Sequence, residues 1–200
     1  MPENETFLDK KDEELVKLIL KDKEDYRYLI QRYEDKLMRY IIRLCGAKRE
    51  DAEDILQNVF LKVYQNLNDF DTSLKFSSWI YRIAHNETVS FLRKLNSRPK
   101  TINSETASFI LNAVRADLNM EQEIDKKNLA EKINETVNGL EGKYRDVLVL
   151  KYLEDKDYRE ISDILKKPPG TVATLLRKAK EQLKKEILKH GYFSKDIKNN

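Results

Sequence analysis

Basic residues are concentrated in one stretch near the C-terminal end of the chain. Residues 166–189 contain eight lysines and arginines but only two glutamates. Hydroxyl and cationic side chains stand near the start of this stretch on one side of a potential helix, at Thr171, Thr174, Arg177 and Lys178. Such side chains bind base edges and phosphate oxygens, and an excess of cations favours binding to a phosphate backbone. The chemistry that these residues indicate is therefore recognition of DNA.

The apolar residues around this basic stretch predict a helix-turn-helix. A first short helix is expected over residues 158–165, where Ile161, Ile164 and Leu165 have helical spacing, and residues 166–170 interrupt the pattern. A second helix is expected next, since proline is tolerated only at the first turn of a new helix. Its one apolar stripe, able to pack on the first helix, is formed by Val172, Leu176, Ala179 and Leu183. The start of such a second helix normally meets base edges in the major groove. An ordinary helical hairpin with a solvated basic face is the alternative, although the tight Pro-Pro-Gly-Thr turn is less common in one.

Acidic and basic residues are also segregated in the first half of the chain. Residues 50–71 contain six acidic residues and one lysine, whereas residues 75–100 contain six basic residues and one glutamate. The second segment carries a strip that combines an amide able to read bases with cations able to hold phosphates, formed by Arg82, Asn86, Val89 and Arg93 and flanked by Tyr81 and His85. Spacing alone leaves two interpretations of this strip open, a solvated helix face and a nucleic-acid surface.

The elements that would position these residues are all helices. Apolar periodicity predicts helices over residues 13–44, with a break near residues 21–25, then over residues 50–67 and over residues 76–95. Trp79 is expected in the core, because Phe76 and Ile83 share its face. With only 5 glycines and 4 prolines and no alternating run of β-branched residues, the composition argues for an all-helical protein.

A shift in composition separates two small domains. Residues 96–127 contain a segment too polar to pack, followed by a short apolar stretch at residues 109–111 that is able to form a helix of its own. The prediction is an all-α protein whose parts are a first domain over residues 9–96, a flexible linker over residues 97–128, and a second domain over residues 129–190 that contains the helix-turn-helix.

Composition also argues against several classes of protein. No apolar run approaches the roughly 18 residues that cross a bilayer, and the N-terminus lacks the pattern of a signal peptide, so no membrane insertion is expected. The single cysteine, Cys45, cannot form an internal disulfide and is expected in the core, and His85 and His190 do not make a zinc ligand set. No phosphate loop or nucleophile–base spacing stands out. Neither an enzyme with a small-molecule substrate nor a cofactor or metal is expected.

Four motifs in one order carry a resemblance to a known family. They are residues 51–64 (DAEDILQNVFLKVY), residues 76–86 (FSSWIYRIAHN), residues 91–94 (FLRK) and the turn at residues 170–172 (GTV). Together they resemble bacterial RNA polymerase sigma factors of the extracytoplasmic-function (ECF) class of the sigma-70 family, over nearly the whole chain outside the linker. The resemblance implies a minus-ten reader and a minus-thirty-five reader joined by a linker threaded through the polymerase. It also implies a non-enzymatic cytoplasmic protein that binds core RNA polymerase and promoter DNA, and that an anti-sigma factor, commonly membrane-anchored, holds inactive.

The resemblance also implies roles for particular residues. The acidic helix would dock on the clamp helices of the largest polymerase subunit, through Asp51, Asp54, Gln57 and Asn58. The loop over residues 68–75 would capture a flipped non-template base, and it includes Asn68, Asp69, Phe70, Asp71 and Lys75. The following helix would hold the melted strand, through Tyr81, Arg82, His85, Asn86 and Arg93. Minus-thirty-five recognition falls to Thr171, Thr174, Arg177 and Lys178.

The chain departs from the family pattern at a few positions, which affect the promoter that is read and how tightly. Ala173, Thr174 and Leu175 stand where many members have Lys, Ser and Arg, Ser90 stands where Asp is common, and residues 140–142 replace the usual Leu-Pro. A two-domain repressor or activator with a helix-turn-helix is the main alternative function. It does not predict the acidic helix or a base-capturing loop. A helical protein–protein adaptor would leave the charge segregation unexplained.

Overall fold

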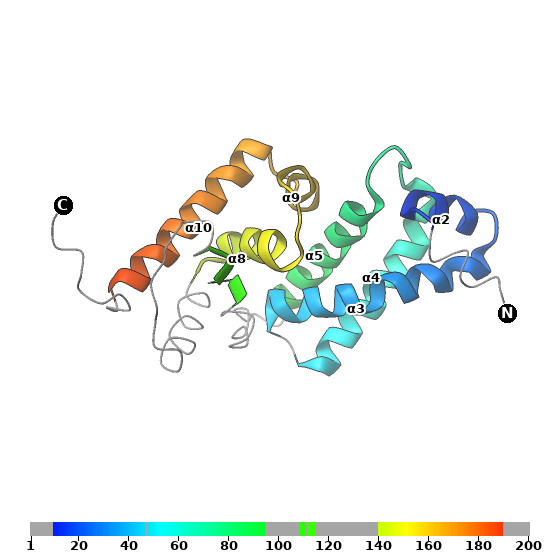
Figure 1. Cartoon of the computed structure of the whole chain (residues 1–200). Coiled ribbons are helices and arrows are strands. Elements are labelled where there is room, and N and C mark those ends of the chain that lie inside the picture. Colours follow the sequence, from blue (N-terminus) through cyan, green and yellow to red (C-terminus); the bar gives the residue numbers. More distant parts are fainter. Residues whose placement is uncertain (1–9, 47, 95–108, 111, 115–139, 190–200) are drawn as a thin grey trace. The chain divides into compact units, whose positions relative to one another are not determined.

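The computed structural model describes residues 10–46, 48–94, 109–110, 112–114 and 140–189 (Figure 1). The described residues form helices and connecting turns without any strand. They belong to two compact units, one made mainly of residues 1–42 and 47–98 and the other mainly of residues 99–162 and 167–200. The prediction of an all-helical protein with two small domains is confirmed.

The described part of the first unit is built from α-helices joined by short turns. α2 (Asp12–Ile19) is followed by a turn of 3-10 helix (Lys23–Asp25), α3 (Tyr26–Cys45), α4 (Arg49–Asn66), a second 3-10 turn (Leu67–Asp69) and α5 (Phe76–Lys94). The break after α2 is stabilised locally, because the Asp22 carboxylate accepts the backbone N–H of Glu24 at 2.9 Å. The predicted helices and the predicted break between the first two are all present.

The core of this unit is formed by the apolar faces of its helices, and α4 packs on α5. Its fully buried side chains include Leu15, Ile19, Leu29, Leu37, Ile41, Val59, Val63, Phe76 and Ile80. Each buried aliphatic or aromatic side chain of this size contributes roughly 1.5–3 kcal/mol to folding. The polar residues between them are left on the outer faces of α4 and α5.

The described part of the second unit includes the helix-turn-helix. α8 (Gly142–Leu148) continues into a π-helical turn (Val149–Leu153), which is followed by α9 (Tyr158–Leu165) and α10 (Pro169–Lys189). α10 packs against α8. The apolar stripe predicted for α10 is buried at all four positions, Val172, Leu176, Ala179 and Leu183.

Local hydrogen bonds set both ends of α9. At its start, Asp157 and Glu160 form a reciprocal capping box, in which each carboxylate accepts the backbone N–H of the other residue at 2.8 and 3.0 Å. At its end, Lys166 adopts a left-handed conformation with a φ of 52°, and the Ser162 hydroxyl donates to the Lys167 carbonyl at 2.6 Å. Pro169 then begins α10, where its missing N–H costs nothing.

Most of the predicted linker lies outside the described residues. Within it, residues 109–110 and 112–114 are helical, as expected for the apolar stretch there, and Ile110 and Val114 are buried. Cys45 is buried, as predicted. None of the helices described is both long enough and apolar enough to cross a membrane.

Candidate nucleic-acid interface

α4 presents a polar face on the side opposite its buried one. Asp54, Gln57 and Asn58 are exposed and Asp51 is half-buried, whereas Ile55 and other apolar residues of the same helix point into the core. The Asn58 amide donates to the Asp54 carbonyl at 2.8 Å, which keeps this side chain along the helix surface. The four residues predicted for protein docking therefore lie on one helix, with three of them open to a partner.

One residue of this face was missed by sequence reasoning. Leu61 of α4 is 55% exposed, although it lies within a helix whose other large aliphatic side chains are buried. It stands four positions after Gln57 and three after Asn58, which places all three on the same side of the helix. The signal available in the sequence was that Leu61 falls outside the buried spacing of Ile55, Val59 and Val63.

α5 carries the polar strip predicted from spacing. Asn86 and Arg93 are exposed, and Arg82 and Val89 are half-buried. An ion pair joins the outer sides of the two helices, because Lys62 of α4 contacts Glu87 of α5 at 2.6 Å. The strip is thus a surface with an amide and two guanidinium groups along one helix, and its arginine and asparagine side chains are suited to phosphates and base edges.

The loop between α4 and α5 has exposed polar residues and a buried aromatic anchor. Asn68, Asp69, Asp71 and Lys75 are exposed, but Phe70 is only 5% exposed. The Phe70 ring lies 5.2 Å from each of the rings of Phe76 and Trp79, which hold it in the core. Trp79 is itself half-buried, so its core position is confirmed in part.

A turn shapes the tip of this loop. The Asp71 carboxylate accepts the Ser73 backbone N–H at 2.9 Å, and the Leu74 N–H donates to the Asp71 carbonyl at 3.0 Å. Hydrogen bonds from the side chain and backbone of Ser73 hold the pKa of the Asp71 carboxyl below its usual value. Leu74 is 56% exposed at this tip, where it offers an apolar surface beside polar groups.

Two aromatic residues predicted for the strand-binding helix lie against α3. Tyr81 is only 3% exposed and its ring lies 5.1 Å from that of Tyr40. The Tyr40 hydroxyl is within hydrogen-bond distance, 3.1 Å, of Nδ1 of His85, which is half-buried. Tyr81 therefore does not present its ring to solvent, and its stacking on a base stays a prediction that requires the ring to move.

The basic helix of the second unit exposes all four predicted residues. Thr171, Thr174, Arg177 and Lys178 are exposed, and the neighbouring Leu175 is half-buried. The Thr174 hydroxyl donates to the Gly170 carbonyl at 2.9 Å, which leaves its oxygen able to accept. Arg177 is paired with Glu181 at 2.5 Å, and both side chains are more than half exposed, so this pair contributes little to folding.

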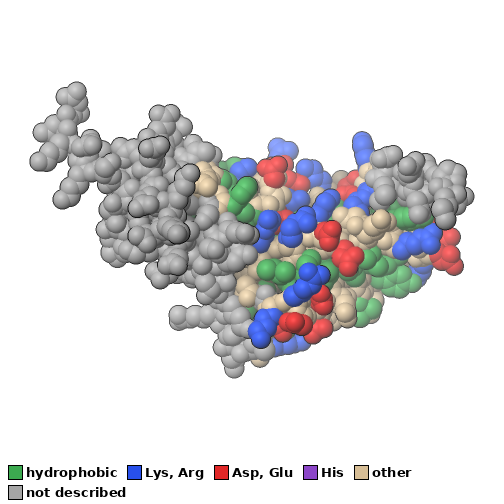
Figure 2. Space-filling view, turned by 60° about the horizontal axis from the view of Figure 1, so that its bottom comes forward, with side chains coloured by type: hydrophobic (Ala, Val, Ile, Leu, Met, Phe, Trp, Pro, Cys, Tyr) green, Lys and Arg blue, Asp and Glu red, His purple; other side chains and the backbone are tan. Residues whose placement is uncertain are grey.

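Charge segregation along the sequence does not give a uniformly charged face everywhere. On the face shown in Figure 2, acidic, basic and hydrophobic side chains lie next to one another.

Among the described residues there is no group of three or more histidine, cysteine or acidic residues that would hold a metal ion. The features that point to function are therefore those of individual helices, namely the polar face of α4, the strip of α5 and the basic start of α10.

A helix-turn-helix in one unit and a polar strip beside an acidic helix in the other define a helical DNA-binding protein. Comparisons with known proteins agree. The family model for sigma-70 region 2 matches residues 29–98, and the model for sigma-70 region 4 matches residues 130–183. The chain is 33% identical to the ECF RNA polymerase sigma factor SigW of Bacillus subtilis over 172 residues, which cover 83% of this chain and 90% of that protein. It is 27% identical to the RNA polymerase sigma-H factor of Pseudomonas aeruginosa over 181 residues, or 88% and 93% of the two chains.

Solved structures show the same fold. CnrH in complex with the cytosolic domain of CnrY matches with a TM-score of 0.64 at 20% identity, over 90% of this chain and 97% of that chain. The sigma factor RpoE in complex with the anti-sigma factor NepR from Bartonella quintana matches with a TM-score of 0.57 at 17% identity, over 82% and 97%. The chain belongs to the ECF class of RNA polymerase sigma factors, which act in the initiation of transcription.

Proposed function

We propose that the two units divide the work of promoter recognition between them. In the first unit, α4 docks on core RNA polymerase, and the loop over residues 68–75 and α5 capture and hold the melted minus-ten strand. In the second unit, the start of α10 reads the minus-thirty-five element. The proposed boundaries are residues 9–96 for the first domain, 97–128 for the linker and 129–190 for the second domain.

The observation that carries this proposal is the pairing of two different outer surfaces in one small unit. α4 exposes Asp54, Gln57 and Leu61, which suit a protein partner, while the adjacent α5 exposes Asn86 and Arg93, which suit nucleic acid. A repressor or activator that acts without polymerase has no use for the first surface. The melted strand supplies contacts that offset the few kcal/mol needed to unpair a base, so opening requires no ATP.

The remaining features of the proposal concern partners and location. The protein acts without enzymatic activity and without a cofactor, and it works in the cytoplasm, where its polymerase and DNA are. Two related folds were solved with a partner, CnrH with the cytosolic domain of CnrY and RpoE with the anti-sigma factor NepR. By analogy, an anti-sigma factor holds this chain inactive, and a membrane-anchored one would keep it at the membrane.

Run-off transcription tests the proposed function directly. Purified core polymerase is incubated with genomic promoter fragments, with and without this protein. Discrete transcripts that appear only when the protein is present support the proposal. Binding to the same fragments without any core-dependent transcript would favour the repressor or activator instead.

Charge reversal on α4 should weaken the polymerase contact. Asp51→Lys with Asp54→Lys places two cations where the docking face is acidic, and we expect at least a ten-fold weaker affinity, equivalent to about 1.4 kcal/mol. The fold should survive, because Asp54 is exposed and Asp51 is only half-buried, and surface charges contribute little to stability. Affinity for core polymerase is measured by titration, and circular dichroism checks the helices.

A matched control separates docking from net charge. Glu34→Lys with Asp35→Lys makes the same change of charge at two exposed positions of α3. This control should bind core polymerase like the parent protein. Equal weakening of both double variants would mean that general electrostatics, and not the face of α4, governs the interaction.

Two substitutions in α10 should have different effects on minus-thirty-five binding. Lys178→Ala removes a cation suited to phosphate, so binding should weaken on every promoter variant and its salt dependence should become shallower. Thr174→Ala should change preference at particular base pairs, with a loss of about 1–3 kcal/mol if the hydroxyl makes a good base contact. Binding is measured on a set of single-base promoter variants at several salt concentrations. If both variants bind the whole set like the parent, α10 is not the reader.

A further inference from the structure

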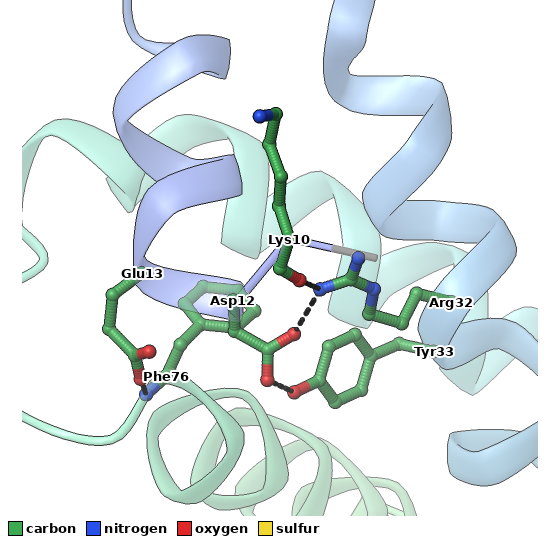
Figure 3. Close-up of polar contacts among 6 residues, drawn as sticks. All are labelled: Lys10, Asp12, Glu13, Arg32, Tyr33 and Phe76. Carbon is green, nitrogen blue, oxygen red and sulfur yellow. Dashed lines mark hydrogen bonds and ion pairs between the residues drawn. The ribbon is translucent and has the colours of Figure 1, made fainter. Parts of the chain in front are cut away.

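The first turn of α2 makes a direct contact with the start of α5. The Glu13 carboxylate accepts the backbone N–H of Phe76, the first residue of α5, at 2.9 Å (Figure 3). The two residues are separated by 63 positions in the chain. The match to the region 2 family begins at residue 29, so α2 lies outside it.

The Glu13 contact takes the place of a local cap on α5, because the residue before this helix offers no side-chain acceptor. Lys75 occupies the cap position, since its carbonyl accepts the Trp79 N–H at 3.3 Å. The first N–H groups of a helix have no partner inside the helix, and the usual cap is a side-chain oxygen, which lysine does not have. Glu13 supplies that oxygen from another helix. Its negative charge also lies at the positive end of the α5 dipole.

The neighbouring carboxylate, that of Asp12, acts on Phe76 indirectly, through the ring of Tyr33. Asp12 accepts the Tyr33 hydroxyl at 2.5 Å and pairs with Arg32 at 2.7 Å (Figure 3). The Tyr33 ring packs edge-on against the Phe76 ring, with centroids 5.7 Å apart. Burial, and then the nearby Asp12 carboxylate, raise the pKa of Tyr33 further above physiological pH, and its hydroxyl is a donor to Asp12. Glu13 thus holds the backbone of Phe76 directly, and Asp12 holds its side chain through the Tyr33 ring.

Phe76 in turn holds the loop that precedes it. Its side chain is fully buried, and its ring lies 5.2 Å from that of Phe70, inside the loop, and 5.5 Å from that of Trp79. Any shift of Phe76 would move both the C-terminal end of the loop and the aromatic anchor in its middle. Phe76 therefore connects the acceptor on α2 to the loop through direct contacts.

We propose that Glu13, supported by Asp12, is a positioning residue for promoter opening. It fixes the first turn of α5 and the loop over residues 68–75 in the geometry that captures the melted strand. This inference rests on the proposed function of that loop and of α5. Glu13 acts through Phe76 and not by contact with DNA, so its loss should affect opening and leave recruitment to duplex DNA intact.

Three substitutions in full-length protein test the inference. Glu13→Ala removes the acceptor, Glu13→Gln keeps an acceptor oxygen without the charge, and Glu14→Ala alters an exposed neighbour in the same turn. With core polymerase on duplex promoter, Glu13→Ala should give two- to five-fold fewer open complexes, measured by permanganate reactivity. The upper value, about five-fold, corresponds to the usual cost of losing one helix cap. Closed complexes should be unchanged. Glu13→Gln should restore most of the opening, and Glu14→Ala should match the parent.

Hydrogen exchange adds a readout at the site itself, because the Phe76 amide should exchange faster in Glu13→Ala than in Glu13→Gln. Asn86→Ala is included as a separate arm for the proposed function. Normal opening by Glu13→Ala beside defective opening by Asn86→Ala would overturn the inference and leave the proposed function standing. Normal opening by both would overturn both. An equal loss of core binding, closed complexes and opening in Glu13→Ala and Glu13→Gln would mark Glu13 as merely structural, which also overturns the inference.

Discussion

Asn86→Ala is expected to reduce open-complex formation by roughly ten-fold or more while leaving recruitment to duplex promoter DNA intact. Asn86 is exposed in the middle of the α5 strip, so its amide is available to a base or a sugar-phosphate group. Unpairing a base costs a few kcal/mol, which contacts with the single strand must supply, and about 1.4 kcal/mol of lost contact is a factor of ten. Minus-thirty-five contacts involve closed duplex and should not change.

Shortening the loop by deletion of Thr72 and Ser73 should have the same effect. The deletion removes the turn in which Asp71 accepts the Ser73 N–H, so the exposed loop residues lose their arrangement. Permanganate reactivity of promoter thymines in the presence of core polymerase reports opening, and a gel-shift assay reports closed complexes.

Gln65→Ala is a matched control for Asn86→Ala, since it removes an exposed amide from the neighbouring helix α4. This control should open promoters like the parent. Normal thymine reactivity in Asn86→Ala and in the loop deletion would refute the assignment of opening to this loop and helix, although the protein would remain a sigma factor.

The helices of the first unit were predictable because their cores follow simple periodicity. Apolar spacing located α4 and α5, and the interruption of that spacing by Lys166, Lys167 and the two prolines located the turn and the start of α10. The exposure of Asn86, Arg93 and Lys178 also followed from spacing, since positions opposite a buried stripe face solvent.

The aromatic residues of the candidate site were not predictable in the same way. Phe70 lies in a loop, which has no periodicity to indicate the direction of its ring, and the structure buries it. Tyr81 lies beside the polar strip in sequence, but its ring turns toward Tyr40 of α3. A polar neighbour in sequence says little about an aromatic side chain that has an apolar body to bury.

The Glu13 cap was beyond sequence reasoning for a different reason. Capping patterns connect residues three or four positions apart, whereas Glu13 and Phe76 are 63 positions apart. The sequence around the start of α5 showed only that the Lys75 side chain, which has no acceptor, cannot cap the helix that follows it. A helix start without a local acceptor leaves its first N–H groups to water or to an acceptor elsewhere in the fold, and the sequence does not indicate which.

Phe70→Ala is expected to lower the free energy of unfolding of the first unit by about 3 kcal/mol, the lower end of the usual cost of removing a buried phenylalanine ring. Phe70 is 5% exposed and contacts the rings of Phe76 and Trp79, so alanine would leave a cavity beneath the loop. Against a typical stability of about 5–15 kcal/mol, such a loss shifts the urea unfolding midpoint substantially. Phe70→Leu refills much of the volume and should cost less.

Comparison of stability with opening then decides what Phe70 does. Leu74→Ala is the control, because Leu74 is 56% exposed in the same loop and its loss should change stability by no more than about 0.5 kcal/mol. If Phe70 serves as the anchor of the loop, urea unfolding and promoter opening should fall together in Phe70→Ala and recover together in Phe70→Leu. A Phe70→Ala protein that is as stable as the parent but fails to open promoters would instead show that the ring leaves the core to contact DNA. The same result would remove the packing step by which Phe76 is inferred to position the loop.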